Sequence, residues 1–248
     1  MGLTPRTPAE ALAGPIVHMG TIGSTNDRAR ELAAAGAPDR TVLVADRQTA
    51  GRGRQGRTWV APPGHSLTFS LLVRTEDDQL RDLPIVAAVA VCEACERIAG
   101  VEAQIKWPND VWIERRKVAG ILIEARPQES WAVVGVGVNV NTSEDEFPPE
   151  LRESATSLAI ASGSEVSRDE LLDAMFERLT GLLDERPEAA LDAYRTRDAL
   201  FDRQIEWSSG AGTAKGIDER GNLVVFTGEG KRVALDAGEV HLHGLRPP

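Results

Sequence analysis

Four strand-like patterns follow one another in the middle of the chain, and this succession limits the folds open to it. Each is a short run rich in β-branched residues, and no helical pattern separates one run from the next. The runs are Val101–Lys106, Val111–Ile113, Lys117–Ala125 and Trp131–Val140. Strands joined by such short connections pair as hairpins, because a parallel connection needs about a dozen residues or more. We therefore expect a sheet that is at least partly antiparallel.

Further strands and helices surround this run. Strand patterns precede it at Ile16–Met19, Thr41–Ala45 and Ser66–Arg74, and helical patterns lie at Leu83–Ile98, Arg168–Leu183 and Pro187–Arg197. Another helix is expected after Ser24, which would cap it with Asp27 at the capping-box position. The sequence thus predicts an α/β fold of the α+β type with a mixed sheet.

The composition changes near residue 200. Five short strand-like runs follow, separated by glycine or aspartate: Gln204–Ser208, Thr213–Ile217, Asn222–Thr227, Arg232–Leu235 and Val240–Leu242. They predict a small β-barrel, so we expect one domain over residues 1–200 and another over residues 201–248. Close to the end of the chain, His241 and His243 are interpreted as surface residues.

The charge balance excludes some functions. The chain of 248 residues has 28 lysines and arginines against 38 aspartates and glutamates, a formal net charge of −10. Polyanions demand a basic surface, so a protein whose main task is to coat nucleic acid or an anionic membrane is not expected. Only a local basic patch could reverse this.

No segment indicates a membrane or an export signal. The longest apolar stretch, Leu83–Cys92, has about half of the roughly 20 residues that span a bilayer. Residues 1–15 lack a basic region followed by an apolar one, so we expect a cytoplasmic protein. Cys92 and Cys95 are interpreted as two small thiols on one helix face. A redox pair stays an alternative, whereas a zinc site would need further ligands that do not cluster nearby.

One loop inverts the sign of the chain's charge. No acidic residue lies between Asp46 and Glu76. The same window contains five arginines: Arg47, Arg52, Arg54, Arg57 and Arg74. Alternating glycine and arginine gives a backbone that can approach a ligand closely, with guanidinium groups suited to carboxylate or phosphate. A solvated flexible loop and an RNA-binding segment are the alternatives.

Two more patterns place polar residues at strand ends or faces. Pro108 and Asn109 favour a turn that presents Asn109 and Asp110 beside Lys117, although such a turn is common. On the last strand of the run, Gly135, Gly137 and Asn139 share one face, because side chains alternate with a period of two. Glycine weakens a strand, so the close approach of a ligand or another backbone is the usual reason for it.

Taken in chain order, these patterns resemble the biotin protein ligases. The matching residues are Ser24-Thr25-Asn26, the loop Gly51 to Arg57 with Trp59, Lys106-Trp107-Pro108-Asn109-Asp110, Lys117-Val118-Ala119-Gly120-Ile121-Leu122 and Gly135 to Asn139. The resemblance covers nearly the whole chain. It implies a catalytic domain similar to class II synthetases, followed by an SH3-like C-terminal domain. These enzymes join biotin and ATP to form biotinyl-5′-AMP, and then pass biotin to one lysine of a carrier protein.

The resemblance also implies residue roles. Biotin would contact Ser24, Thr25, Asn26, Gln48, Gly51, Arg52, Gly53, Arg54, Lys117, Gly120, Gly135 and Gly137. ATP or the adenylate would contact Arg52, Arg54, Arg57, Trp59, Asn109, Lys117 and Asn139. The implied catalytic residues are Lys117, Arg54 and Asp110. Asp110 and Asn109 would orient either Mg²⁺ or the incoming lysine, and no metal ligand is assigned. Trp59, Trp107 and the segment Thr142–Leu158 would wall the adenylate, unless the tryptophans are structural.

The implied partner is the biotin carboxyl carrier domain of an acyl-CoA carboxylase. Because the first matching motif begins at Ser24, we expect no N-terminal DNA-binding domain and no specific binding to DNA. A lipoate ligase or lipoyl transferase is the alternative enzyme. Proteins similar to those families carry an Arg-Arg-x-x-Gly-Gly-Gly-x-Val-x-His pattern, which this chain lacks. A non-catalytic nucleic-acid-binding module is the alternative of another class. The oligomeric state is not indicated.

Overall fold

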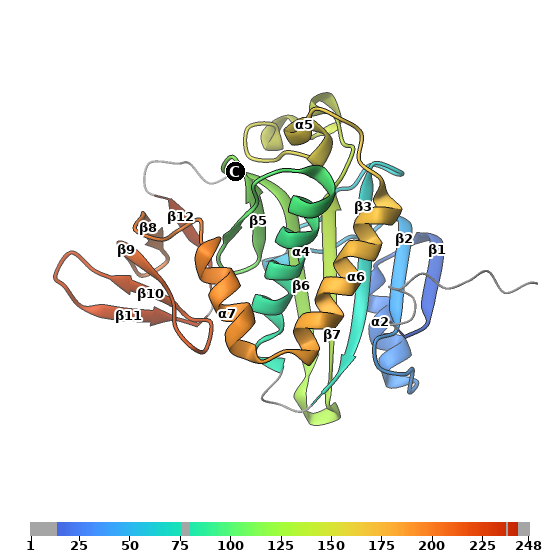
Figure 1. Ribbon diagram of the computed structural model, residues 1–248, viewed down its shortest axis with the longest axis horizontal. Helices are drawn as coiled ribbons and strands as arrows, with labels where there is room; N and C mark the ends of the chain where they lie inside the picture. The colour runs from blue at the N-terminus through green and yellow to red at the C-terminus, as the bar shows by residue number, and fades with distance from the viewer. Residues whose placement is uncertain (1–13, 76–79, 237, 243–248) are drawn as a thin grey trace, which may run out of the picture.

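A computed structural model describes residues 14–75, 80–236 and 238–242. Its strands form two sheets (Figure 1), one of seven strands in the order β1-β2-β3-β7-β6-β5-β4 and one of five. The strands of the large sheet are β1 (Ile16–Ile22), β2 (Val42–Gln48), β3 (Ser66–Arg74), β4 (Gln104–Lys106), β5 (Asp110–Ile113), β6 (Arg116–Arg126) and β7 (Trp131–Asn139).

The large sheet is mixed, as predicted. β1 and β2 pair in parallel, because helix α2 (Thr25–Ala34) forms the crossover between them. The other neighbouring strands pair in antiparallel fashion, including the run from β4 to β7. All residues of β7 and nearly all of β3 are buried, so these two strands form the centre of the sheet.

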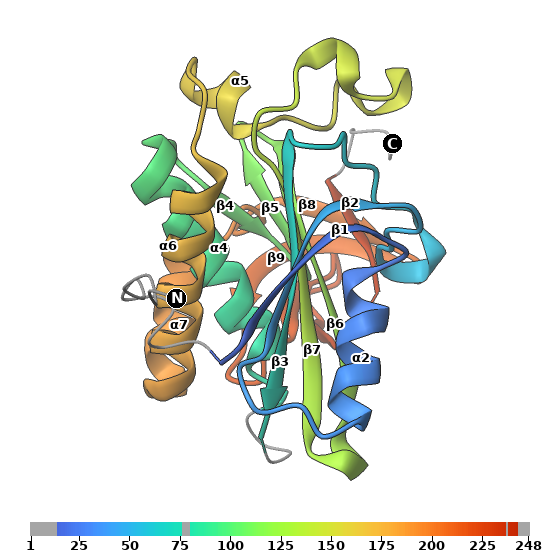
Figure 2. The same ribbon diagram turned by 90° about the vertical axis from the view of Figure 1, so that its right-hand side faces the viewer.

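Helices cover the two faces of this sheet unequally (Figure 2). On one face lie α4 (Leu83–Ala99) and α6 (Arg168–Asp184), with α7 (Pro187–Thr196) packed against α4. Here the rings of Phe69 and Phe176 meet edge to face, 5.1 Å apart. On the other face α2 lies alone and buries Ala29 and Ala33 against the sheet. This second face is therefore only partly covered.

The order and extent of the elements follow the sequence prediction closely, with two differences. The short helix α5 (Leu158–Ser162) and the three-residue helical turns at Arg54–Gly56, Pro127–Glu129, Glu144–Glu146 and Pro149–Leu151 were not expected. The predicted capping box of α2 is wrong. Ser24 has the extended backbone of an N-cap, but its side chain makes no capping hydrogen bond. Asp27 pairs instead with Arg30 and Arg52.

The small sheet is antiparallel throughout and has the order β11-β10-β9-β8-β12. Its strands are β8 (Gln204–Trp207), β9 (Gly210–Ile217), β10 (Leu223–Phe226), β11 (Arg232–Leu235) and β12 (Val240–Leu242). The indole N–H of Trp107 donates to the Gly221 carbonyl at 3.0 Å and so joins the two sheets. A domain boundary between residues 200 and 201 stays a prediction. Among the described residues, no helix is both long and apolar enough to cross a membrane.

Candidate active site

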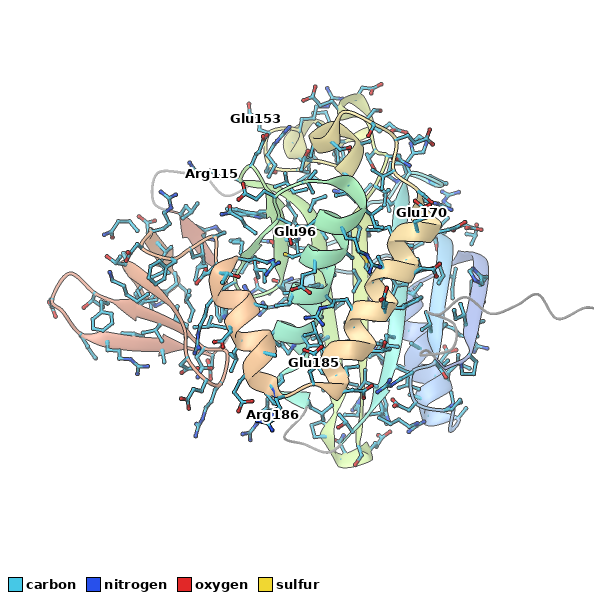
Figure 3. All side chains as sticks on the ribbon, viewed as in Figure 1. Glu96, Arg115, Glu153, Glu170, Glu185 and Arg186 are labelled. Carbon is cyan, nitrogen blue, oxygen red and sulfur yellow. The ribbon has the colours of Figure 1, made fainter. Side chains whose placement is uncertain are left out.

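A cavity of about 1150 Å³ lies on the sheet face that α2 covers only in part. It is bordered by the N-terminal end of α2, the arginine-rich loop, the β4–β5 turn, the segment before α5, and β12 of the small sheet. Every residue that was assigned a catalytic role or a contact with biotin or ATP, except Gly51, lines it: Ser24, Thr25, Asn26, Gln48, Arg52, Gly53, Arg54, Arg57, Trp59, Asn109, Asp110, Lys117, Gly120, Gly135, Gly137 and Asn139. Arg115 and Glu153, also in the lining, lie near the α5 end of the molecule (Figure 3).

Hydrogen bonds among neutral side chains, together with one to the Glu124 carboxylate, organise the α2 end of the cavity. The backbone N–H of Thr25 donates to Gln48 Oε1 at 2.7 Å. The buried hydroxyl of Ser70 lies 2.8 Å from Thr25 Oγ1 and 2.7 Å from Asn26 Oδ1. Asn26 Nδ2 in turn donates to Glu124 Oε2 at 2.9 Å. These bonds fix the orientation of the amide groups, so the polar groups at this end are preorganised.

The two strand glycines make room for neighbouring side chains. A Cβ on Gly135 would lie 2.0 Å from Asn26 Oδ1, and one on Gly137 would lie 2.4 Å from the Trp59 ring. The predicted glycine face is therefore present, and it already accommodates Asn26 and Trp59. The Trp59 indole N–H is buried and finds no hydrogen-bond partner among the described residues. An unused buried donor in a cavity lining is a ready contact for a ligand.

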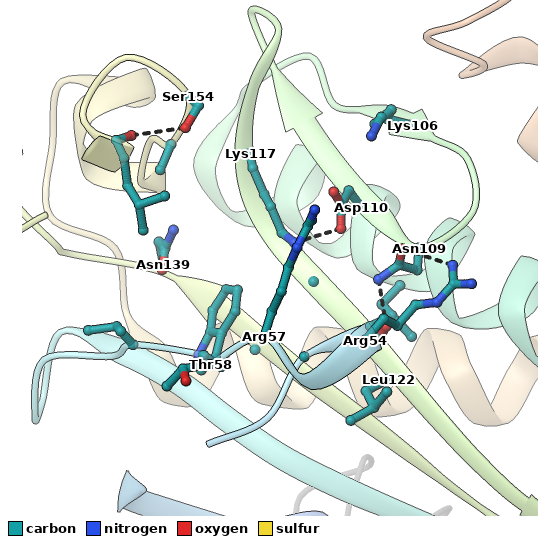
Figure 4. A pocket seen from close by; sticks show the side chains of 18 of the residues that line it. Arg54, Arg57, Thr58, Lys106, Asn109, Asp110, Lys117, Leu122, Asn139 and Ser154 are labelled. Carbon is teal, nitrogen blue, oxygen red and sulfur yellow. Dashed lines mark hydrogen bonds and ion pairs between the residues drawn. The ribbon is translucent and has the colours of Figure 1, made fainter. Parts of the chain in front are cut away.

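Lys117 and Asp110 form an ion pair in the middle of the cavity (Figure 4). Lys117 Nζ lies 2.6 Å from Asp110 Oδ1 and 5.8 Å from the centre of the Trp59 ring. The backbone of Lys117 is bonded to the segment before α5, because its N–H donates to the Ser154 carbonyl at 2.7 Å. The predicted catalytic lysine is thus fixed at both its main chain and its side chain.

Acidic partners that are distant in the sequence neutralise part of the arginine-rich loop. Arg52 Nη2 lies 2.6 Å from Asp27 and 3.1 Å from Glu124, and Arg57 Nη2 lies 2.7 Å from Glu239 before β12. The loop also turns back on itself, since Gly53 N–H donates to the Arg57 carbonyl at 2.7 Å. The local excess of positive charge that the sequence shows in this loop is therefore smaller in the folded protein.

Arg54 has no carboxylate partner among the described residues and donates to Asn109 Oδ1 at 3.3 Å (Figure 4). Asn109 is itself held by its Nδ2, which donates to the Ile121 carbonyl at 3.0 Å. Gly51, the predicted residue outside the lining, is buried under the loop. A Cβ there would lie 2.7 Å from the Trp59 carbonyl oxygen, so Gly51 serves the packing of the loop.

Other predictions about single residues have mixed outcomes. Trp107 is buried at the junction of the two sheets and does not line the cavity. The prediction that it forms a wall of the adenylate site is therefore wrong, and the alternative, a structural tryptophan, is confirmed. Cys92 and Cys95 are free and buried, and burial raises the pKa of Cys95 to about 12, which disfavours a reactive thiolate. His241 is half-buried and lines the cavity, contrary to a plain surface position. His243 lies outside the described residues.

Several lining residues were not singled out from the sequence. Lys106 stands at the end of β4 within a recognised motif, and Trp112 follows in β5. Glu124, two residues beyond the motif that ends at Leu122, does not line the cavity itself, but it contacts the lining residues Asn26 and Arg52. Glu239 comes from the small sheet, where no local pattern indicated a ligand. Alternation along β5 and β6 could have placed Trp112 on the site face.

Protein-family models match both parts of the chain. The Biotin/lipoate A/B protein ligase family matches residues 20–141, which contain most of the cavity lining. The Biotin protein ligase C terminal domain matches residues 211–242, which contain most of the small sheet. The two matches define a ligase of the biotin and lipoate class that carries the C-terminal domain of the biotin ligases.

Individual relatives show to which family within this class the chain belongs. The chain is 34% identical over 234 residues to a biotin–acetyl-CoA-carboxylase ligase of Mycobacterium tuberculosis, covering 88% of this chain and 85% of that one. Its fold is similar to the biotin protein ligase from Aquifex aeolicus in complex with biotin and ATP, with a TM-score of 0.81, 31% identity, and coverage of 92% and 98%. The chain belongs to the biotin protein ligase family.

A further relative is longer than this chain. The chain is 41% identical over 164 residues to the bifunctional ligase/repressor BirA of Bacillus spizizenii, a match over 64% of this chain and 50% of the relative. The match thus spans about half the length of that protein.

Proposed function

We propose that this protein is a biotin protein ligase that activates biotin with ATP to biotinyl-5′-AMP and transfers biotin to a lysine of a carrier domain. One observation carries the proposal: a single cavity joins a preorganised hydrogen-bonding end, built mainly from neutral side chains, to the Lys117–Asp110 ion pair. Biotin is mostly apolar, with a polar ureido end and a carboxylate tail. It needs such a site, because its ring requires directed hydrogen bonds and its carboxylate requires a nearby cation.

In the proposed first step, a biotin carboxylate oxygen attacks the α-phosphorus of ATP. The bond from that phosphorus to the bridging oxygen breaks, and pyrophosphate leaves with the electron pair. Two anions must approach each other, and the fixed ammonium of Lys117 offsets their repulsion and the charge of the transition state. Arg54 lies beside Asn109 and would contact the same phosphate.

In the proposed second step, the amine of the carrier lysine attacks the acyl carbon of biotinyl-5′-AMP. An amide bond forms, AMP leaves with the electron pair of the broken acyl–phosphate bond, and the amine loses a proton. Asp110 is the carboxylate nearest to Lys117 in the cavity and is the group we assign to orienting the incoming amine or the nucleotide's metal ion.

At the other end of the cavity, Ser24, Thr25, Asn26 and Gln48 would hold the ureido ring. Thr25 and Asn26 are fixed by Ser70 and Gln48, so the bicycle would meet groups that need no rearrangement. Ser24 is buried and its hydroxyl is not used in capping, which leaves it for the ligand. The strand with Gly135 and Gly137 would lie beneath the ring.

Mg²⁺ belongs to the proposal as a companion of ATP. Among the described residues no cluster of three or more histidine, cysteine or acidic side chains could hold a metal by itself. The single carboxylate of Asp110 fits the usual binding of Mg²⁺ through one or two carboxylates plus substrate phosphates. When bound, the ion would neutralise phosphate charge, with Asp110 as its protein ligand.

The proposed partner is the biotin carboxyl carrier domain of an acyl-CoA carboxylase, and the proposed location is the cytoplasm, where ATP is supplied. Incubating the protein with ATP, Mg²⁺ and either biotin or lipoate, followed by mass detection of the acyl-AMP, tests the activity. We expect biotinyl-5′-AMP with biotin and no adenylate with lipoate. Lipoyl-AMP as the main product, or no adenylate at all, would refute the proposal.

A further inference from the structure

Lys106 extends the line of site residues to the edge of the large sheet. In the register of the sheet, Gly137 of β7 pairs with Gly120 of β6, Gly120 pairs with Asp110 of β5, and Asp110 pairs with Lys106 of β4. Residues paired in this way share one face of a sheet. All four line the cavity. The row therefore leads from the glycine strand, past the Lys117–Asp110 pair, to Lys106.

The ammonium of Lys106 differs from the other cations along this path. Lys117 is paired with Asp110, and Arg57 with Glu239. Among the described residues Lys106 makes no ion pair or hydrogen bond that would occupy its ammonium, which lies 5.6 Å from the centre of the Trp112 ring. It is half-buried, on the far side of Asp110 from Lys117 in Figure 4. A partly desolvated cation without an anionic partner is poised to accept one.

The electrostatic surroundings agree with this. Burial lowers the pKa of Lys106 below its ordinary value, with opposing contributions from nearby Asp110 and, to a smaller extent, Glu239. Lys117 and Arg57 add to the lowering as like charges. An anion that entered between these three cations would offset both the desolvation and their mutual repulsion.

We propose that Lys106 binds the β- and γ-phosphates of ATP and then the pyrophosphate that leaves. This inference rests on the proposed function. The attacking and leaving oxygens of a phosphoryl transfer lie roughly in line. Biotin would enter from the Thr25–Asn26 end, beside β3 and β7, with Lys117 at the reacting phosphate. The leaving group must then depart on the opposite side, towards β5 and β4, where Lys106 stands.

The proposal assigns Lys106 to one half-reaction only. Pyrophosphate is gone before the carrier lysine arrives, so a phosphate-binding lysine acts on adenylation and not on transfer. It also does not contact the ureido end, so it leaves the affinity for biotin unchanged. A residue that only supported the fold would alter all three quantities together.

The test compares Lys106→Met, which keeps the alkyl stem and removes the charge, with Lys106→Arg, which keeps the charge. Lys231→Met, in the exposed connection between β10 and β11, is the matched control. For Lys106→Met we expect the KM for ATP and the inhibition constant of pyrophosphate to rise about tenfold to a hundredfold, the range of one charged hydrogen bond. Lys106→Arg should recover part of this. Biotin affinity, and the rate of transfer from preformed biotinyl-5′-AMP, should match the parent.

A direct titration of inorganic pyrophosphate with Mg²⁺ by calorimetry separates this inference from the proposed function, because it needs no catalysis. Loss of pyrophosphate binding in folded Lys106→Met, with binding kept in Lys231→Met, supports the assignment even if the parent forms no biotinyl-5′-AMP. Equal pyrophosphate binding by parent and Lys106→Met overturns it. So does a transfer rate from preformed adenylate that falls as much as the rate of adenylation.

Discussion

At the α2 end of the cavity, Thr25 and Asn26 are buried and held by Ser70 and Gln48, whereas at the loop end Arg52 and Arg57 are exposed and held by carboxylates. Buried neutral hydrogen bonds are directional and little affected by salt. Exposed ion pairs contribute about 0–1 kcal/mol each and are screened by salt. The first end therefore keeps one shape, while the second can exchange its carboxylates for an anionic ligand at small cost.

The largest effect should come from the residue where the two ends meet. Lys117→Ala removes the cation beside the reacting phosphate, and we expect adenylation to fall by a factor on the order of 10²–10³ while the fold is kept. Pyrophosphate release measures this, and circular dichroism checks the fold. Lys215→Ala, on the small sheet, is the control. Release by Lys117→Ala at close to the parental rate would remove Lys117 from the catalytic role.

A substitution at Gly135 should disrupt the hydrogen bonds that preorganise the α2 end of the cavity. In Gly135→Ala the new Cβ would meet Asn26 Oδ1, so the amide must leave its bonds to Ser70 and Glu124. We expect a loss of about 1–3 kcal/mol in the free energy of unfolding, as for overpacked cores, and weaker biotin binding by about tenfold or more. Urea unfolding and calorimetry measure the two.

The control for that change is Gly20→Ala in β1, where a Cβ would meet nothing within 4 Å. If Gly135→Ala binds biotin as tightly as Gly20→Ala, then Asn26 does not need its observed position for binding, and the comparison between a fixed end and an exchangeable end fails.

Local sequence patterns could predict the fold, and the resemblance to the biotin protein ligases predicted the site residues that line the cavity. The alternation from Lys117 to Asn139 and the apolar run of α4 are local signals, and the observed elements follow them within a few residues. The motifs contain the site residues, because each motif lies within a strand of the large sheet or in the segment that follows one.

The sequence did not indicate the contacts between segments that are distant along the chain. The carboxylates that pair with Arg52 and Arg57 come from α2, β6 and the small sheet, and no local pattern links Glu239 to a loop about 180 residues earlier. The Ser24 capping box failed for the same reason, since Asp27 has a tertiary partner in Arg52 that local rules do not consider. The turns before α5 lack a regular apolar period.

Arg54→Gly tests how the loop end of the cavity holds the adenylate. Arg54 has one hydrogen bond, to Asn109, and is the loop arginine most available to the adenylate. Adenylate formation should be spared more than retention, and we expect biotinyl-5′-AMP to dissociate about tenfold faster. Released adenylate would acylate nearby lysines without specificity. Dissociation measured by stopped flow, against Arg186→Gly before α7 as control, tests this, and equal rates in mutant and parent would refute it.

The smallest effect is expected for the Arg57–Glu239 pair, which joins the loop to the small sheet at 2.7 Å. Because Arg57 is more than half exposed at 56%, a double-mutant cycle of Arg57→Gln and Glu239→Gln should give a coupling free energy of about 0.2–1 kcal/mol, lower at high salt. Urea unfolding at two salt concentrations measures it. A coupling of about 2 kcal/mol or more that salt does not change would mean that this pair is a fixed part of the site. In that case the loop end would be as preorganised as the α2 end, and an incoming phosphate could not displace Glu239.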